Sequence, residues 1–257
     1  MRNKVERHQE VLENLGFREI RLVGKGMFAS VYRGWDEKNN RYVACKVSTG
    51  QDILRRESGY LQKLEHPLFA DYYDYAQRGE LSILVTEYIW GRTLETLLLH
   101  RGRLSVKESV RIGGELAQGL RWLHEMREPV IYRDLKPANI MIREDGSVKL
   151  IDLGCAGPLN DRAIAGSRGY AAPEQLLGNI ASGPYSDVYG LGKVMLDMNS
   201  YEDDRYMRRL LDKCVRVRIE ERVPDMRAFL YELNQKHRRK RGKQNEYLFE
   251  KNMIQFL

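Results

Sequence analysis

Four polar residues lie beside apolar segments in the middle of the chain, where charged side chains are least expected. The stretch VIYRDLKPANIMI, residues 130–142, carries Asp134, Lys136 and Asn139 between two apolar runs, and the apolar part of VKLIDLG ends at Asp152. A strand and a loop in this arrangement can direct two side-chain oxygens to one metal ion. Mg²⁺ prefers such hard oxygen ligands and keeps substrate phosphates in its coordination shell. The arrangement therefore suits a site where two of these side-chain oxygens meet at one magnesium ion.

Two glycines precede a strand near the N-terminus. VGKGMFASVY places Gly24 and Gly26 ahead of Val31 in the pattern GxGxxGxV, with Ala29 at the third glycine position. Glycines let a backbone approach a polyphosphate so that amide N–H groups face its oxygens. A strand follows rather than a helix, which separates the pattern from a dinucleotide-binding fingerprint. A hairpin that merely contains glycines is the alternative.

A lysine lies inside the apolar strand that contains VACK. Burying the Lys46 ammonium is costly unless an anion pairs with it. Two interpretations stay open: an edge strand with an outward lysine, or a buried cation that awaits an anion. Glu57, in LRRESGYL on the following helix, is a candidate partner, and a solvent-exposed helix charge is its alternative.

The elements that must position these residues are strands in the first part of the chain. Alternating apolar and polar residues between turn residues predict strands over residues 17–26, 29–35, 41–48 and 81–89. DEKNN, between the second and third, predicts a hairpin turn. Helices are expected over residues 1–15 and 52–64. The first part is therefore predicted to be a small antiparallel sheet with one helix, preceded by a helical extension.

From about Thr93 the apolar period becomes helical. LSVKESVRIGGELAQGLRWLHEM opens with Ser105 and, three residues later, Glu108, which is the pattern of a capping box. Further helices are expected over residues 186–198, 205–216 and 226–236. EYIWGRT is a short connector between the two parts and suits a hinge. The fold class is therefore α+β.

The composition is that of an ordinary globular protein. The 257 residues are 42% hydrophobic and 31% charged, enough for one large domain or two modest lobes. Much of the net charge of +7 lies in KHRRKRGK, Lys236 to Lys243, so overall basicity is weak support for nucleic-acid binding. Cys45, Cys155 and Cys214 are scattered, which argues against a zinc site or a disulfide framework and fits a reducing cytosol.

Six features occur in a fixed order: GKGMFASV, VACK, Glu57, YRDLKPAN, DLG and AAPE. In this order they resemble the signature of the protein kinase superfamily. GRTL, GYAAPEQ and SDVYGLG resemble the bacterial eukaryotic-like (Hanks-type) Ser/Thr kinases. The resemblance covers most of the chain and implies a two-lobed protein kinase fold. Its expected parts are a helical extension (1–15), a small antiparallel β-sheet N-lobe with one helix (16–89), a larger, mainly α-helical C-lobe (90–235) and a basic tail (236–257).

The resemblance implies roles for the residues at matching positions. Asp134 would accept the proton of the substrate hydroxyl, and Lys136 would steady the transferring phosphoryl group. The implied cofactor is ATP, whose phosphates Lys46, paired with Glu57, would hold. The other ATP-binding residues would be Gly24, Gly26, Val31, Ala44, Met141 and the backbones of Glu87 and Ile89. Mg²⁺, with Mn²⁺ as an alternative, would be held by Asn139 and Asp152.

The resemblance also implies a substrate class and three structural contacts. Lys136, two positions after Asp134, matches the pattern directed to Ser and Thr. The contacts would join Ser167 to Asp134 and Lys136, Glu174 to Arg222, and Asp187 to backbone N–H groups of the catalytic loop.

The chain departs from the family pattern at Ala29, Tyr132 and Leu153, none of which is expected to touch a phosphate or a metal ion. Arg133 stands where many kinases pair an arginine with a phosphorylated residue, yet GCAGPLNDRAIAG contains no Ser, Thr or Tyr. Our hypothesis is that activity needs no such phosphorylation and that Asp161 supplies the anion. Pairing of Arg133 elsewhere or with water is the alternative.

These observations favour a Ser/Thr protein kinase that acts on the Ser and Thr hydroxyls of protein substrates. A nucleotide-binding scaffold without activity and a small-molecule kinase are the alternatives; the first is opposed by the filled catalytic positions, the second by AAPE and SDVYGLG. Lys236 to Lys243 are a candidate contact for an anionic membrane surface, and no specific nucleic acid is expected. No run of about 18 apolar residues occurs. We expect a cytoplasmic protein, membrane-associated if the sequence is a piece of a longer one.

Overall fold

The structure is a computed structural model that describes residues 4–26 and 28–235. Its contacts divide the chain into two compact units. Unit 1 comprises Met1–Thr96 and Ala138–Ala156, and unit 2 comprises Leu97–Pro137 and Gly157–Leu257. The lobe boundary expected at residue 90 stays a prediction. The predicted basic tail, with its proposed membrane contact, lies outside the described residues.

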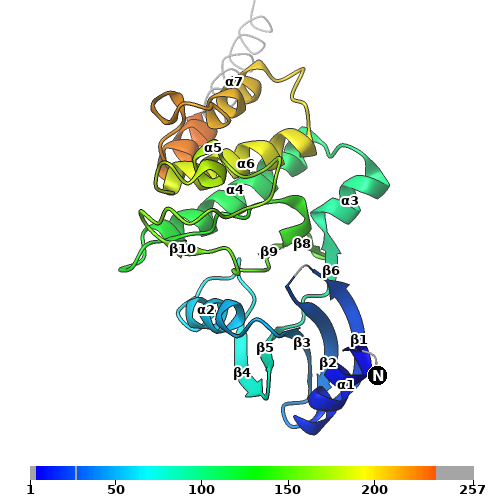
Figure 1. Cartoon of the computed structure of the whole chain (residues 1–257). Helices are drawn as coiled ribbons and strands as arrows, with labels where there is room; N and C mark the ends of the chain where they lie inside the picture. The colour runs from blue at the N-terminus through cyan, green and yellow to red at the C-terminus, as the bar shows by residue number, and fades with distance from the viewer. Residues whose placement is uncertain (1–3, 27, 236–257) are drawn as a thin grey trace, which may run out of the picture. The chain divides into compact units, whose positions relative to one another are not determined.

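Unit 1 contains a five-stranded antiparallel sheet in the order β1-β2-β3-β5-β4 (Figure 1). All four predicted strands are confirmed, and the DEKNN turn joins β2 to β3, where Asn39 donates its N–H to Asp36 Oδ1 at 3.2 Å. The fifth strand, β4, was not predicted. The strands are β1 (Phe17–Lys25), β2 (Ser30–Asp36), β3 (Arg41–Ser48), β4 (Tyr72–Arg78) and β5 (Leu81–Glu87).

Successive side chains of a strand point to opposite sides of a sheet, so the two faces of this sheet carry different residues. One face packs in the core and the other faces a cavity. One face buries Tyr32, Val43 and Cys45 in an apolar core that also contains Leu12 of helix α1 (Lys4–Asn14). The opposite face carries Val31, Ala44 and Lys46 toward a cavity that helix α2 (Gln51–Leu61) helps to line. The predicted helices over residues 1–15 and 52–64 are therefore present, with α1 described from Lys4 onward.

A second, three-stranded sheet in unit 1 follows the order β6-β8-β9. Strand β6 (Gly91–Thr93) pairs with β8 (Ile140–Arg143), which forms a hairpin with β9 (Val148–Leu150). Gly91 must be glycine, because a Cβ there would overlap the Ile142 carbonyl. Asn139 directly precedes this hairpin and Asp152 follows it, and Ile151 donates its N–H to the Asn139 carbonyl at 3.0 Å. The hairpin therefore brings the two predicted metal ligands to one end.

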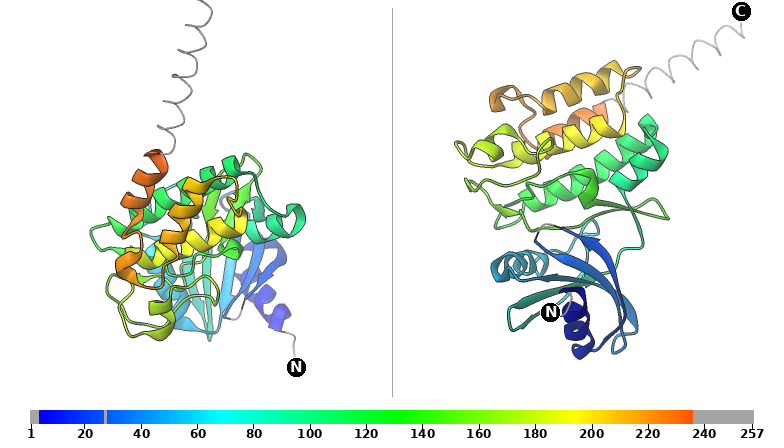
Figure 2. Two further views of the ribbon diagram at one scale, coloured as in Figure 1. Left: turned by 90° about the horizontal axis from the view of Figure 1, so that it is seen from above. Right: turned by 45° about the vertical axis from the view of Figure 1, so that its right-hand side comes forward.

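Unit 2 is mainly helical, as predicted. Helix α4 packs on α6 and α6 on α7, so that the three form successive layers in green, yellow and orange in Figure 2. Ser105 caps α4: its hydroxyl accepts the Glu108 N–H at 3.2 Å, and its own N–H donates to the Glu108 carboxylate at 3.2 Å, which confirms the capping box. The helices are α3 (Leu94–Arg101, which begins in unit 1), α4 (Val106–His124), α5 (Pro173–Leu177), α6 (Pro184–Met198), α7 (Arg205–Cys214) and residues 226–235.

The stretch YRDLKPAN lies between two short strands and ends in a 3₁₀ helix. Strand β7 (Val130–Ile131) precedes it and pairs with β10 (Gly157–Pro158), and the 3₁₀ helix η1 (Pro137–Asn139) leads into β8. The two apolar runs that the sequence shows on either side of this stretch therefore contain strands β7 and β8. Across the described ranges, no helix is both long and apolar enough to cross a bilayer.

Helix α1 is fastened to the sheet by a buried histidine. His8 Nδ1 lies 3.0 Å from the Tyr32 hydroxyl, and both side chains are inaccessible to solvent. Burial, together with the nearby Lys4 and Arg7, lowers the pKa of His8 below its ordinary value of 6.5. Burial also lowers the pKa of His66. The folded protein therefore resists protonation of both histidines more than the unfolded chain does.

Stability is accordingly expected to fall as the pH drops below 6.5, because the unfolded chain then binds protons that the folded chain does not. Thermal unfolding measured from about pH 8 to about pH 5.5 should show the decrease. The double variant His8→Asn, His66→Asn should lose most of this pH dependence. A variant that keeps the full dependence would assign it to other groups.

Candidate active site

The cavity of about 510 Å³ in unit 1 lies on the face of the sheet opposite α1. Strands β1, β2, β3 and β5, helix α2 and the β8–β9 hairpin all contribute to its lining. Gly26 is not part of that lining; its N–H donates to the Ala29 carbonyl at 2.8 Å. Ten predicted site residues meet here: Gly24, Val31, Ala44, Lys46, Glu57, Glu87, Ile89, Asn139, Met141 and Asp152.

Lys46 is paired, which decides between the two interpretations of the lysine. Its Nζ lies 2.7 Å from Glu57 Oε2 and 2.9 Å from Asp152 Oδ1. Burial alone would lower the pKa of Lys46, but the two carboxylates outweigh it, so the pKa is raised and the ammonium stays charged. Glu57 is buried and also accepts the Leu153 N–H at 3.2 Å. The pair thus presents a fixed cation to the cavity.

Asp152 is held in an uncommon backbone conformation. Its φ of 71° lies in the left-handed region that non-glycine residues rarely adopt. Its Oδ1 accepts both Lys46 Nζ and the Gly154 N–H, the latter at 2.9 Å, while its side chain remains 42% exposed. Backbone strain of this kind persists where surrounding contacts enforce it, and it is common at functional sites.

The donor set suits a hard divalent cation. Asn139 and Asp152 bring amide and carboxylate oxygens to the same cavity. Mg²⁺ is typically held by only one or two protein carboxylates, with phosphates and water completing the shell. No group of three or more His, Cys, Asp or Glu side chains suited to a metal occurs in the part of the chain that the structure describes. The residues present therefore fit magnesium carried with phosphates better than a metal site formed by protein alone.

One part of the cavity is lined by apolar side chains from both sheets. Val31 and Ala44 come from the five-stranded sheet and Met141 and Leu150 from the hairpin. At the edge, the Glu87 N–H already donates to the Asp71 carbonyl at 2.9 Å. A ligand at this edge would therefore meet the Glu87 carbonyl rather than its N–H.

Sequence reasoning missed several lining residues. Thr93 and Thr96 place two hydroxyls 2.8 Å apart at the cavity. Both lie in or beside GRTL, which carried a family signal but no chemical one. Ala70, Leu84 and Ile151 are ordinary apolar residues, and nothing in their local sequence distinguishes them from core positions.

Unit 2 holds a second group of predicted residues. Asp134 Oδ1 accepts the Ser167 hydroxyl at 2.7 Å, and its Oδ2 accepts Lys136 Nζ at 2.8 Å. Lys136 Nζ also donates to Ser167 Oγ at 2.7 Å, which closes a triangle and confirms the predicted contacts of Ser167. The triangle holds a carboxylate, an ammonium and a hydroxyl within hydrogen-bonding distance of one another.

The buried carboxylate of Asp187 holds the backbone of the loop that carries Asp134. Asp187 accepts the backbone N–H groups of Tyr132 and Arg133, each at 2.8 Å, which confirms the predicted contact. The same carboxylate lies 2.8 Å from His124 Nε2. Arg133, directly before Asp134, has a φ of 68°. Asp187 therefore enforces a strained backbone at the residue next to the predicted base.

Arg133 forms an ion pair with Asp161, the anion that the sequence analysis suggested. Its Nη1 lies 2.8 Å from Asp161 Oδ2, and its Nη2 donates to the Pro158 carbonyl at 3.0 Å. The side chain of Arg133 is only 2% exposed. Gly157 makes room for it, because a Cβ there would lie 2.6 Å from the guanidinium. The Ala163 N–H, followed by Arg133, lowers the pKa of Asp161, so this carboxylate stays ionised.

A buried ion pair lies elsewhere in unit 2. Arg222 donates to both Glu174 oxygens, at 2.7 and 3.1 Å, which confirms the predicted pair. Both side chains are almost completely buried. Arg222 also donates to the carbonyls of Arg216, Tyr185 and Val217. This pair ties α5 to the segment that follows α7.

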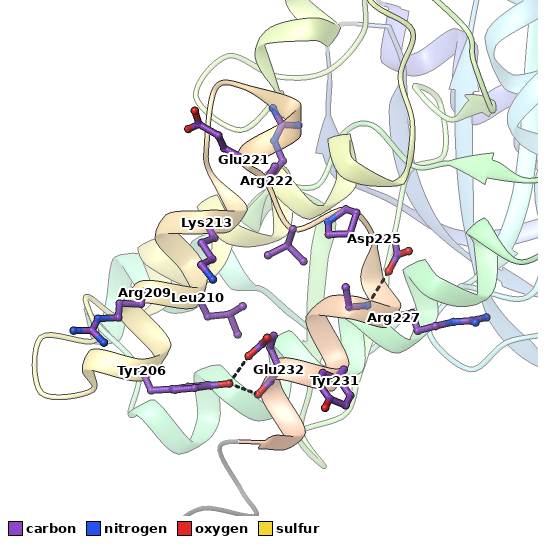
Figure 3. A pocket seen from close by; sticks show the side chains of 13 residues that line it. Tyr206, Arg209, Leu210, Lys213, Glu221, Arg222, Asp225, Arg227, Tyr231 and Glu232 are labelled. Atoms are coloured by element: carbon purple, nitrogen blue, oxygen red, sulfur yellow. Dashed lines mark hydrogen bonds between the residues drawn. The ribbon is translucent and has the colours of Figure 1, made fainter.

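Unit 2 also contains a larger cavity, of about 770 Å³, lined by α7, η2 (Ile219–Glu221) and residues 226–235. Figure 3 shows Tyr206 closing one side through its hydrogen bonds to Glu232, while Asp225 caps the following helix at the Ala228 N–H. None of the predicted site residues lines this cavity. Its size alone therefore does not make it the site of the chemistry.

The chain is similar to protein kinases of a plant and a bacterium. The profile of the protein kinase domain matches residues 17–245. The chain is 34% identical over 215 residues to the probable serine/threonine-protein kinase PBL16 of Arabidopsis thaliana, covering 74% of this chain and 52% of that protein. It is 31% identical over 193 residues to the serine/threonine-protein kinase PrkC of Bacillus subtilis, covering 70% of this chain and 29% of that protein. The chain thus spans about half or less of these curated relatives.

Proposed function

Because the chain belongs to the protein kinase domain family, we propose that it transfers the γ-phosphoryl group of ATP to Ser and Thr hydroxyls of protein substrates. The observation that carries the proposal is the cavity in unit 1, where a buried Lys46–Glu57 pair, Asn139 and Asp152 meet beside an apolar slot. The relatives PBL16 and PrkC are both named as serine/threonine-protein kinases, which supports the same class of substrate.

The nucleotide would bind with its adenine in the apolar slot formed by Val31, Ala44 and Met141. The Lys46 ammonium, held by Glu57, would neutralise charge on the α- and β-phosphates. Since Glu57 already orients the Lys46 ammonium, only the contact between Lys46 and Asp152 has to change when an anion binds. Asp152 would exchange its contact with Lys46 for the metal that accompanies the phosphates.

Asn139 and Asp152 would hold Mg²⁺, and Mn²⁺ is the alternative for the same oxygen ligands. When bound, the metal supplies charge neutralisation and orientation of the phosphates. The protein's own contribution is rigidity: the Ile151 N–H bond to the Asn139 carbonyl keeps the two ligands together.

Asp134 would orient the substrate hydroxyl and accept its proton, while Lys136 would neutralise charge on the phosphoryl group in transit. The Ser167 hydroxyl donates to Asp134 at 2.7 Å, and this contact supports the proposed role because the group that donates is an alcohol. One stretch, YRDLKPAN, carries Asp134, Lys136 and Asn139. Catalysis in this scheme is positioning and electrostatic stabilisation, without a covalent intermediate.

The proposal is tested by labelled phosphate transfer from Mg·ATP to the protein itself and to a generic basic protein, followed by identification of the labelled amino acid. We expect label on Ser or Thr with the wild type and none with Asp152→Asn. Nucleotide binding without transfer, with a thermal shift that is the same with and without Mg²⁺, would favour the scaffold alternative. Transfer to a sugar or an antibiotic in place of protein would favour a small-molecule kinase.

We further propose that Asp161 replaces a phosphate in holding Arg133 beside Asp134. Asp161→Asn leaves a buried guanidinium without a carboxylate, so we expect roughly tenfold lower kcat and a loss of about 1–3 kcal/mol in stability. Steady-state kinetics and thermal unfolding would measure the two effects.

Two controls make this prediction specific. Asp161→Glu keeps the charge and should recover part of the activity. Phosphatase treatment of the wild type should leave its activity unchanged. Stoichiometric phosphate on Ser167 that raises activity would contradict the hypothesis.

A further inference from the structure

Three charged side chains meet at the end of β5. Glu87 accepts Lys149 Nζ on Oε2 at 2.7 Å and the Arg143 guanidinium on Oε1. The side chains of Glu87 and Lys149 are 14% and 10% exposed. Lys149 also donates to the Phe69 carbonyl at 2.9 Å. With a cation on each oxygen, this carboxylate has its strongest interactions inside the protein rather than with a ligand.

Both cations come from the β8–β9 hairpin. Arg143 is the last residue of β8 and Lys149 the middle residue of β9. The same hairpin is preceded by Asn139 and followed by Asp152. Glu87, in contrast, ends the strand whose backbone would face the adenine. The cluster therefore connects the two places at which a nucleotide would be held.

Breaking one of the ion pairs between Glu87 and the hairpin is expected to cost free energy. Removing one partner of a buried charge pair leaves the other desolvated without compensation. The hairpin is also joined to this edge through its backbone: Gly91 of β6 pairs with Arg143, Leu150 of β9 forms a bridge with Phe69, and the Leu150 N–H donates to the Leu68 carbonyl. These contacts fix the direction of the hairpin, while Lys149 and Arg143 are the side chains that join it to Glu87.

We propose that Glu87, Lys149 and Arg143 form a positioning cluster that sets the spacing between the adenine-binding strand and the two metal ligands. This inference rests on the nucleotide site of the proposed function. The cluster acts through the backbone that it holds and not by contact with the phosphates. A nucleotide that contacts both the adenine-binding strand and the metal ligands is sensitive to the spacing between them, because its base and its phosphates are covalently linked. A free nucleoside and a free polyphosphate can each bind without regard to that spacing.

The test compares three probes by isothermal titration calorimetry: adenosine, inorganic tripolyphosphate with Mg²⁺, and Mg·ATP. In Lys149→Met, which removes the ammonium but keeps an apolar side chain, the affinity for Mg·ATP should fall about tenfold, while each separate probe stays within about twofold. In turnover, KM for ATP should rise with kcat within about twofold. Arg7→Met, which breaks the exposed 3.5 Å pair with Glu80 in the same unit, should change none of these values.

If Lys149→Met lost affinity for adenosine and for Mg·ATP by the same factor, the inference would be overturned, since the cluster would then act only on the adenine-binding strand. Behaviour indistinguishable from that of Arg7→Met would overturn it too. If Lys149→Met does not fold, Glu87→Gln carries the test, with the same pattern at smaller size and recovery in Glu87→Asp. A folded wild type that binds none of the three probes would instead overturn the proposed nucleotide site itself.

Discussion

Replacing Asp134 with asparagine is expected to lower kcat for phosphoryl transfer by about 10²–10⁴-fold, the range typical of a lost general base. Asparagine keeps the shape of the side chain, but its neutral amide accepts a hydroxyl proton far less well and no longer pairs with the Lys136 ammonium. Asp134 does not line the cavity in unit 1. The affinity for ATP should therefore stay within about twofold, and the comparison of steady-state kinetics with titration calorimetry separates the two quantities.

The matched control for this variant is Asp212→Asn, which makes the same chemical change on the exposed face of α7. It should leave both kcat and ATP affinity unchanged. If Asp134→Asn keeps activity within about tenfold of the wild type, another group accepts the proton. If it loses ATP affinity as well, Asp134 supports folding rather than transfer.

Removing Arg222 is expected to produce the largest loss of stability. Arg222→Met leaves the Glu174 carboxylate buried with only the Ser186 hydroxyl, which donates to it at 2.9 Å. Breaking one partner out of a buried pair typically costs about 3–5 kcal/mol. Three main-chain carbonyls that accept from Arg222 also lose their donor. Denaturant unfolding followed by circular dichroism would measure the change.

Two further variants define the origin of this loss. Arg208→Met breaks the exposed pair with Asp212, 3.0 Å apart, and should cost only about 0.3–0.5 kcal/mol. Adding Glu174→Gln to Arg222→Met removes the uncompensated charge and should restore part of the stability. A double variant that is no more stable than Arg222→Met alone would attribute the cost to lost packing and carbonyl partners instead.

The sequence predicted most elements because their signals are local. The capping box of α4 needs only Ser105 and Glu108, and β2 and β3 alternate around a turn of polar residues. Strand β4, YYDYAQR, was missed because its tyrosines are only half buried and do not alternate with polar residues. Its pairing with β5 makes it a strand, and that contact is tertiary. Helix α5 has five residues, too few for a helical period.

The residues of the candidate site also fall into those that local sequence motifs predict and those that only the structure identifies. Lys46, Asp134, Asn139 and Asp152 stand in motifs whose order is visible in the sequence. The partner of Arg133 was named only because its segment lacks hydroxyl residues, and the structure supplies the 2.8 Å contact with Asp161. The side chain of Glu87 was missed entirely, because its cations lie 56 and 62 positions away. Long-range charge pairs leave no periodic trace in a sequence.

The composition of unit 1 has a consequence for dividing the protein into fragments. This unit takes in Ala138–Ala156, although the chain on both sides of that segment belongs to unit 2. A fragment that ends at Thr96 would contain Lys46 and Glu57 but lack Met141, Lys149 and Asp152. Such a fragment would lack one wall of the cavity and the carboxylate that faces Lys46. No single cut yields an autonomous nucleotide-binding piece; the hairpin would have to be reattached by a linker.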